Sequence, residues 1–132
     1  MRKATIFSVV LIGLIAGSGF GAIRHVPGEY PRIQAAIQAC EDGDTVVVAP
    51  GVYFETINFS GKDIVVTGTD PMDPKVVAYT VLNGDEDGTV VTFENGETRA
   101  AVLTGFTITG GFGTIDTTLQ TGFRTIWGAG IF

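Results

Sequence analysis

The sequence is poor in cysteine, in basic residues and in proline. Its single cysteine, Cys40, excludes an intrachain disulfide framework and any metal cluster built from cysteines alone. Only 8 lysine and arginine residues stand against 14 acidic ones, and apart from the adjacent Arg2 and Lys3 they are scattered singly along a chain of net charge −6. We therefore expect no nucleic-acid partner. Five prolines among 19 glycines without a three-residue period also exclude a collagen-like chain.

The sequence does contain enough apolar residues for a packed core. Hydrophobic residues make up 45% of the 132 positions and charged residues 17%, so the signature of a disordered chain is absent. This length allows one domain at most. Gly, Asn and Asp repeatedly close short β-branched runs, which is typical of strands joined by turns.

Residues 1–22 have the features of a secretory signal peptide. Two basic residues precede an almost unbroken apolar run over 4–16, and small residues follow over 17–22. A membrane anchor is the alternative, but the run is shorter than the roughly 20 residues that cross a bilayer. We expect cleavage between Ser18 and Ala22 and a secreted or cell-surface protein without a membrane span in its mature chain.

One convincing helix is predicted, opening at 30–32, with Pro31 suited to its first turn. Apolar residues then recur at i, i+3, i+4 and i+7, and these are Ile33, Ala36, Ile37 and Cys40. Gly43 suits a left-handed residue that ends the helix. We expect Cys40 to be a core residue rather than a nucleophile, because the single histidine, His25, precedes the helix in what we predict to be an exposed linker.

From Thr45 onward the pattern changes to short runs rich in β-branched residues. The predicted strands are 45–49, 57–59, 64–67, 80–82, 90–93 and 101–109. Continuous apolar runs such as Val46–Val48 and Val76–Val77 favour strands covered on both faces, or the strands of a parallel solenoid. The polar stretch from Phe112 to Trp127 is predicted to be a loop.

Several runs share one ending, which indicates internal repetition. Ile64–Gly68 is similar to Val102–Gly105, and the latter to Phe106–Gly110. A spacing on the order of 20 residues with insertions is typical of solenoids and allows about three to four coils. The stretch Gly128–Phe132 looks like one more strand, so we expect its open edge to be continued by further sequence or covered by another molecule.

The sequence from Tyr30 to Ile37, followed by that from Gly43 to Tyr53, resembles the opening of secreted right-handed parallel β-helix proteins of the pectin-lyase type. The resemblance covers roughly Val26 to Gly111 and implies an amphipathic helix that caps the first coil. We therefore expect an all-β fold over residues 23–132, a right-handed parallel β-helix with an N-terminal capping α-helix. The likeness is specific for fold and weak for activity, since lyases, esterases, epimerases and adhesins share this opening.

A narrower likeness concerns Gly51-Val52-Tyr53-Phe54-Glu55, which resembles a segment near the start of pectin methylesterases. The paired aspartates, glutamines and arginine that those enzymes carry on later coils have no match here. We therefore expect Gly51 to turn the chain, Tyr53 to pack and Glu55 to be solvated. No catalytic residue is assigned.

The stretch from Asn83 to Glu94 has nearly the spacing of an EF-hand calcium loop. Oxygen ligands alternate at Asn83, Asp85 and Asp87, Gly88 stands sixth and Glu94 twelfth. Strand-like residues before this stretch and within it depart from the EF-hand motif. An acidic turn between two strands accounts for the same residues. Calcium is the one cofactor considered, with Asn83, Asp85, Asp87 and Glu94 as its candidate ligands.

The leading functional expectation is a secreted structural or glycan-binding surface module that is not catalytic by itself. Aromatic residues are many for a short chain, and any that face outward could stack on the sugar rings of a polysaccharide. The alternative is the N-terminal fragment of a polysaccharide-active enzyme, of the pectin esterase or lyase type, whose catalytic residues lie beyond Phe132. A small calcium-stabilised binding module is a third possibility.

Overall fold

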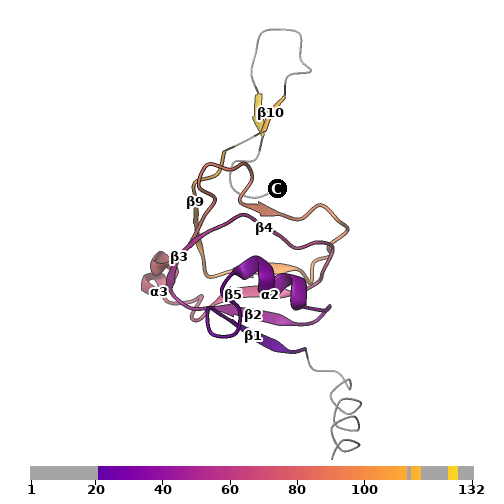
Figure 1. Cartoon of the computed structure of the whole chain (residues 1–132), viewed down its shortest axis with the longest axis vertical. Helices are drawn as coiled ribbons and strands as arrows, with labels where there is room; N and C mark the ends of the chain where they lie inside the picture. The colour runs from indigo at the N-terminus through magenta and orange to yellow at the C-terminus, as the bar shows by residue number, and fades with distance from the viewer. Residues whose placement is uncertain (1–20, 113, 117–124, 128–132) are drawn as a thin grey trace, which may run out of the picture.

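The computed structural model describes residues 21–112, 114–116 and 125–127, which are mostly strands in parallel sheets (Figure 1). A four-stranded parallel sheet consists, in spatial order, of β1 (Ile23–Val26), β2 (Thr45–Val48), β5 (Val65–Gly68) and β8 (Val102–Thr104). A three-stranded parallel sheet consists of β3 (Gly51–Phe54), β6 (Thr80–Asn83) and β9 (Thr107–Thr109). The remaining pairs are parallel β4 (Ile57–Asn58) with β7 (Val91–Thr92), and antiparallel β10 (Thr114–Asp116) with β11 (Thr125–Trp127). The helices of the described part are α2 (Ile33–Ala39) and α3 (Pro74–Tyr79).

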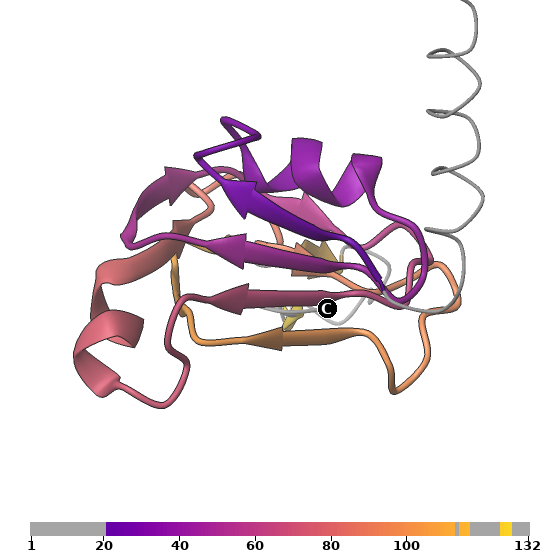
Figure 2. The ribbon, with the colours of Figure 1, turned by 90° about the horizontal axis from the view of Figure 1, so that it is seen from below.

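The chain visits the three parallel sheets in turn and returns to each one strand further along. It runs through β2, β3 and β4, then through β5, β6 and β7, and then enters β8 and β9. Figure 2 shows the strands of the four-stranded sheet lying side by side, with α2 beyond β1 and β2. Parallel strands cannot be joined by tight hairpins, so each pairing partner comes from a distant part of the sequence.

Alternate residues of these strands point into one core. Val46 and Val48 of β2, Val66 of β5 and Leu82 of β6 have no exposed surface. The core residues are Val26, Ile33, Ala36, Ile37, Cys40, Val46, Val48, Ile57, Phe59, Ile64, Val66, Leu82, Val90 and Val91. The continuous apolar runs of the sequence therefore place every second residue in the core and leave the others half-buried in the sheet.

The predicted strands are confirmed to within one or two residues, with three differences. The run 101–109 is two strands, because Gly105 turns the chain between β8 and β9 with φ of 80°. Val76 and Val77 lie in α3, where the Asp73 side chain accepts a hydrogen bond from the Lys75 backbone N–H and proline occupies the first turn. Strands β1 and β3 were not predicted.

The helix prediction is confirmed for the apolar stripe and wrong at both ends. Ile33, Ala36 and Ile37 are buried, and Cys40 is 3% exposed. The helix begins after Arg32, so Pro31 precedes it, and Cys40 itself is the C-terminal cap. Gly43 does adopt a left-handed φ of 90°, but in the turn that leads into β2.

One of the repeats inferred from the sequence corresponds to two strands that pair in the structure, β5 and β8. Val65, Val66 and Thr67 pair in register with Val102, Leu103 and Thr104. The third similar run, which contains β9, belongs to a different sheet and pairs with β6. Similar endings therefore identify strands that end in comparable turns, whichever sheet they occupy.

The loop predicted between Phe112 and Trp127 is wrong at 114–116 and 125–127, which pair as antiparallel strands. The remainder of that stretch, the strand expected at 128–132 and the signal segment over 1–20 lie outside the described residues. Within the described part, no helix is long and apolar enough to cross a membrane.

Candidate functional site

The outward side of the three-stranded sheet carries one aromatic, two aliphatic and three uncharged polar side chains, and it is called the aromatic face below. Strand alternation places two rows of side chains there, and register aligns them across the sheet. One row is Val52, Val81 and Thr107, and the other is Phe54, Asn83 and Thr109. No member of either row is charged, although 17% of the chain is.

The first strand of this face is its most exposed apolar part. Val52 is 55% exposed and Phe54 is 64% exposed, whereas Tyr53 between them packs on the core. Single exposed apolar residues are ordinary, but neighbouring ones on a sheet form a continuous surface. Phe54 stands beside Asn83 and Thr109, so an aromatic ring and polar side chains share one row.

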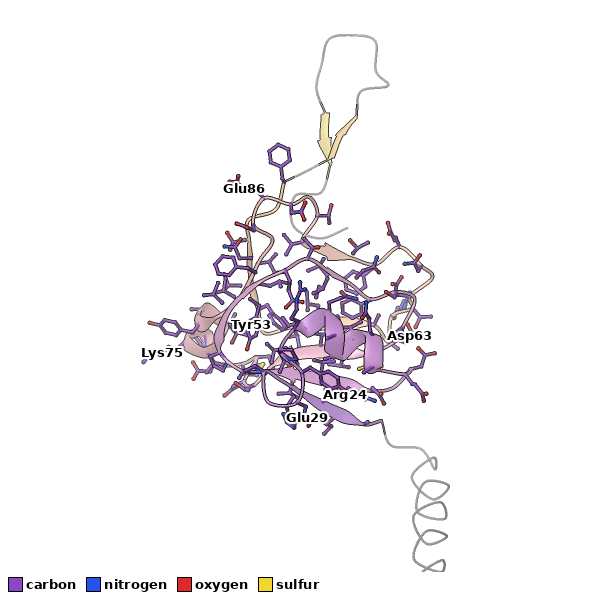
Figure 3. The ribbon with its side chains drawn as sticks, viewed as in Figure 1. Arg24, Glu29, Tyr53, Asp63, Lys75 and Glu86 are labelled. Carbon is purple, nitrogen blue, oxygen red and sulfur yellow. The ribbon has the colours of Figure 1, made fainter. Side chains whose placement is uncertain are left out.

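Helix α3 lies at the end of the face where β6 and β9 begin. The Thr107 hydroxyl donates to the Val77 carbonyl oxygen at 2.9 Å, which fixes α3 on β9. Tyr79, the last residue of α3, is 72% exposed. Figure 3 places Lys75 on α3 and Glu86 at the turn after β6, so charged groups stand at the two ends of the face rather than on it.

The expectation that Glu55 is solvated is wrong. Glu55 is 7% exposed, and both of its carboxylate oxygens accept hydrogen bonds from the first turn of α2. The Ile33 N–H donates to Oε2 at 3.0 Å and the Gln34 N–H donates to Oε1 at 2.8 Å. Arg32, the residue at the N-cap position, forms no side-chain cap. Glu55 therefore supplies the missing cap from the residue that follows β3.

The other two expectations for this segment concern Tyr53 and Gly51. Tyr53 packs against the core as predicted, and its hydroxyl donates to the Ala49 carbonyl oxygen at 2.7 Å. Burial, with a smaller contribution from the charge of Glu55, raises the pKa of Tyr53. Gly51 is the first residue of β3 rather than part of an isolated turn. Gly51, Tyr53 and Glu55 therefore have structural roles in this chain.

The four candidate calcium ligands are placed on different elements. Asn83 ends β6 and its side-chain oxygen accepts the Asp85 N–H at 2.8 Å, while Asp85 and Asp87 lie in the turn that follows and Glu94 comes after β7. Asp85 has a left-handed φ of 53°. Among the described residues no group of three or more His, Cys, Asp or Glu side chains could hold a metal ion. Of the four, Asp85 and Asp87 alone lie in the acidic turn that the sequence also predicts, and calcium binding stays a prediction.

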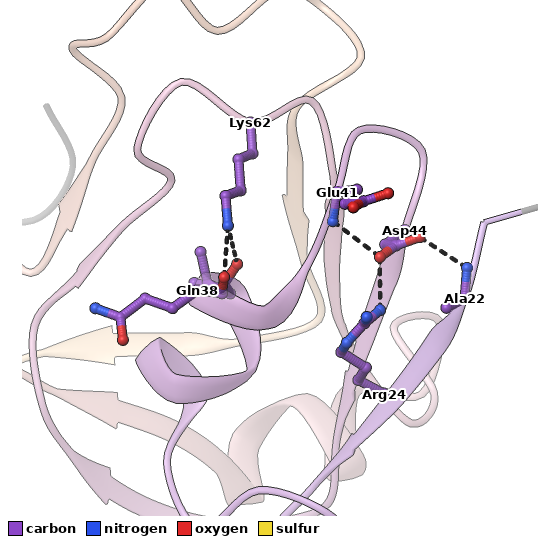
Figure 4. Close-up of polar contacts among 7 residues, drawn as sticks. Ala22, Arg24, Gln38, Glu41, Asp44 and Lys62 are labelled. Carbon is purple, nitrogen blue, oxygen red and sulfur yellow. Dashed lines mark hydrogen bonds and ion pairs between the residues drawn. The ribbon is translucent and has the colours of Figure 1, made fainter.

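A second polar cluster, called the Asp44 cluster below, lies where the chain enters β1 (Figure 4). Asp44 is 7% exposed, and its carboxylate forms an ion pair with Arg24. It also accepts the Ala22 N–H at 2.8 Å and the Glu41 N–H at 2.9 Å. Burial opposes ionisation, yet the hydrogen bonds from Glu41 and Ala22 and the charge of Arg24 hold the pKa of Asp44 below its ordinary value.

The structure places Cys40 in the core and His25 on an exposed position of a strand. The thiol is buried, and burial raises its pKa, which disfavours the nucleophilic thiolate. His25 is exposed, as expected, but it lies in β1 rather than in a linker. Cys40 is thus a core residue, as its helical spacing predicts.

No protein-family model, no curated protein and no solved structure matches this chain.

Sequence reasoning did not place Val52 and Phe54 on this face because it did not predict β3. The alternation Gly51-Val52-Tyr53-Phe54 starts at a glycine and is only four residues long. A period-2 reading of these residues, with Tyr53 inward and its neighbours outward, would have found Val52 and Phe54. Their neighbours on β6 and β9 are known only from the register of the strands, which could not be predicted from the sequence.

Proposed function

We propose that the chain is a secreted module built as a right-handed parallel β-helix, and that its aromatic face binds a polysaccharide or cell-surface glycan without catalysing its breakdown. The fold proposal is supported by three parallel sheets that the chain visits in a repeated order. Parallel crossovers are right-handed in about 98% of cases. Helix α2 packs against β1, β2 and β4, in the position that a capping helix of such a solenoid would take.

The observation that carries the binding proposal is the exposed ring of Phe54 in one row with Asn83 and Thr109. The apolar faces of sugar rings pack on aromatic side chains, and their hydroxyl groups need hydrogen-bonding partners beside the ring. A sheet surface with threonine and asparagine next to phenylalanine supplies both. The absence of charge from the two rows favours an uncharged glycan, because the chain as a whole is acidic and repels polyuronates.

The likeness to pectin methylesterases supports the fold rather than an activity. Its most distinctive residue, Glu55, has both oxygens engaged by α2, so it is not available as an acid or base. We therefore propose a binding module and do not propose a hydrolytic or lyase activity for the described residues.

Affinity gel electrophoresis with a neutral β-glucan, a galactomannan and a polygalacturonate in the gel tests this proposal. We expect a neutral polysaccharide to retard the exported protein more than polygalacturonate does. Phe54→Ala should weaken binding about 2- to 13-fold, since an aromatic contact is worth about 0.5–1.5 kcal/mol. Phe112→Ala is the matched control, because Phe112 is also exposed, at 57%, but lies outside the two rows. Equal losses in both variants, or no retardation by any polysaccharide, would contradict the proposal.

A further inference from the structure

Along the described residues, the backbone of Ala22 makes the first hydrogen bonds to the rest of the domain. Its N–H donates to Asp44 Oδ1, and its carbonyl oxygen accepts the Thr45 N–H at 2.9 Å. Strand β1 begins with the next residue. Ala22 is thus the point at which the polypeptide becomes part of the four-stranded sheet.

The Asp44 carboxylate, which accepts the Ala22 N–H, can bind a second positive charge besides that of Arg24. Asp44 is nearly buried, its two oxygens are divided between Ala22 on Oδ1 and Arg24 with Glu41 on Oδ2, and it stays ionised. An amide N–H uses only part of what such a carboxylate can offer. A charged donor at the same place would form a stronger, charge-assisted hydrogen bond.

The preceding residue satisfies a separate requirement. Gly21 lies so close to the Gly43 carbonyl oxygen that any side chain at this position would collide with it. A leader peptidase also needs small residues at the first and third positions before the bond that it cuts, and Gly21 and Gly19 are such residues. The close approach to Gly43 concerns only the chain in which Gly21 is still attached, whereas the peptidase preference bears on the cut itself, and a glycine satisfies both.

From this geometry we propose that processing cleaves the Gly21–Ala22 peptide bond and that the new α-ammonium group of Ala22 binds Asp44. Water adds across the bond, so that Gly21 leaves as a carboxylate with the leader and Ala22 keeps an amine that takes up a proton at neutral pH. The ammonium nitrogen takes the place of the amide that now lies 2.8 Å from Asp44 Oδ1. Cleavage completes the Asp44 cluster with a second cation beside Arg24.

The charged groups around this terminus determine its pH dependence. Asp44 faces it directly and favours the ammonium, and Arg24 of β1 opposes it from the other oxygen, to which Glu41 donates its backbone N–H. The Cys40 thiol at the end of α2 interacts electrostatically with both Asp44 and Arg24. The direct hydrogen bond dominates, so the folded-state pKa of the amine is raised above its ordinary value of about 7.7–8.0. The stabilisation is complete below that ordinary value and is lost as pH rises through the raised one.

The first test is export of the full chain from a secreting bacterial host, followed by intact mass and N-terminal sequencing. We expect the product to begin at Ala22. A product that begins at Gly19, Phe20 or Ile23 would overturn this inference while leaving export intact. The inference rests on the export part of the proposed function. Failure of the chain to leave the cytoplasm would therefore contradict export itself, whereas polysaccharide binding is measured separately.

The second test is the thermal midpoint of the exported product between pH 7 and 9. We expect it to fall by about 4 °C or more over this range, by the usual relation between free energy and melting temperature for a domain of this size. Asp44→Asn should remove that dependence, and Asp42→Asn, a neighbouring carboxylate that bonds the Asp63 N–H instead, should retain it. The charge of Asp44 contributes to the raised pKa of Cys40, so all three proteins are compared in a Cys40→Ala background, in which the thiol cannot titrate. Identical pH profiles in the wild type and Asp44→Asn would overturn the inference.

Discussion

Glu55 shows how a single side chain joins two parts of the fold that are far apart in sequence. The first turn of α2 has backbone N–H groups without intrahelical partners, and Arg32 does not cap them. The Glu55 carboxylate, 22 residues further on, accepts two of these groups in a nearly buried position. Its negative charge also lies at the positive end of the helix dipole. Helix α2 is therefore held by a residue of the next strand-and-turn unit.

Glu55→Gln should destabilise the protein by about 1–3 kcal/mol. The amide retains one acceptor oxygen, but its NH₂ group faces a backbone N–H and cannot accept from it, which leaves a buried donor unsatisfied. Urea unfolding followed by circular dichroism measures the change. Glu29→Gln, an exposed carboxylate in the turn before α2, is the control and should stay within about 0.5 kcal/mol. Equal midpoints for the two variants would show that Glu55 does not cap the helix.

The sequence alone could not have assigned this role to Glu55. Its neighbours, Phe54 and Thr56, give no sign of burial, and glutamate is seldom buried without a partner. The partner here is a pair of backbone groups, which carry no residue-type signature. Cys40 is the opposite case, because its place at the end of a helical apolar stripe predicted burial from spacing alone, and the structure confirms it.

At the scale of elements, successive strand-and-turn units place similar residues against one another. Phe59 follows β4 and Phe93 follows β7, and their rings lie 4.2 Å apart at 29°, a stacked arrangement. The side chains of Asn58 and Asn95 lie 3.4 Å apart in the same region of the fold. Phe59 is fully buried and is the largest side chain of the core. The contact between two units therefore depends heavily on this one ring.

Phe59→Ala should cost about 3–5 kcal/mol, because it removes a fully buried ring and leaves a cavity beside Phe93. Phe112→Ala removes the same atoms from an exposed position and should change stability by less than about 0.5 kcal/mol. Denaturant midpoints of the two variants and the wild type provide the comparison. A small effect at Phe59 would mean that these units do not share a packed core.

Two kinds of signal in the sequence led to correct elements. Helix α2 was signalled by its apolar stripe, and strands β2, β5 and β6 were signalled by short β-branched runs close to turn residues. Val76 and Val77 were assigned to a strand on side-chain type, yet the Asp73-Pro74 start outweighs β-branching over one short helix. Local chemistry at an element's first residue thus decided the outcome, and the apolar composition did not.

For the whole molecule, the pairing order makes stability uneven across the four-stranded sheet. Strands β2 and β5 have a hydrogen-bonded partner on each side, whereas β1 pairs only with β2 among the described residues. In a stack of repeated units each one is stabilised by its neighbours, so units with two neighbours open least often. The order of strands in space therefore predicts an order of protection that their order in sequence does not.

Hydrogen–deuterium exchange followed by mass spectrometry should show this order directly. We expect peptides that cover β2 and β5 to exchange at least about tenfold more slowly than peptides that cover β1, because opening β1 breaks one ladder and opening an inner strand breaks two. Glu55→Gln, which loosens α2 over this end of the sheet, should speed exchange in β1 more than in β5. A sheet that opened as a single unit would instead show equal protection in all three strands and equal acceleration by the substitution, and the stacked arrangement would then not govern how this protein unfolds.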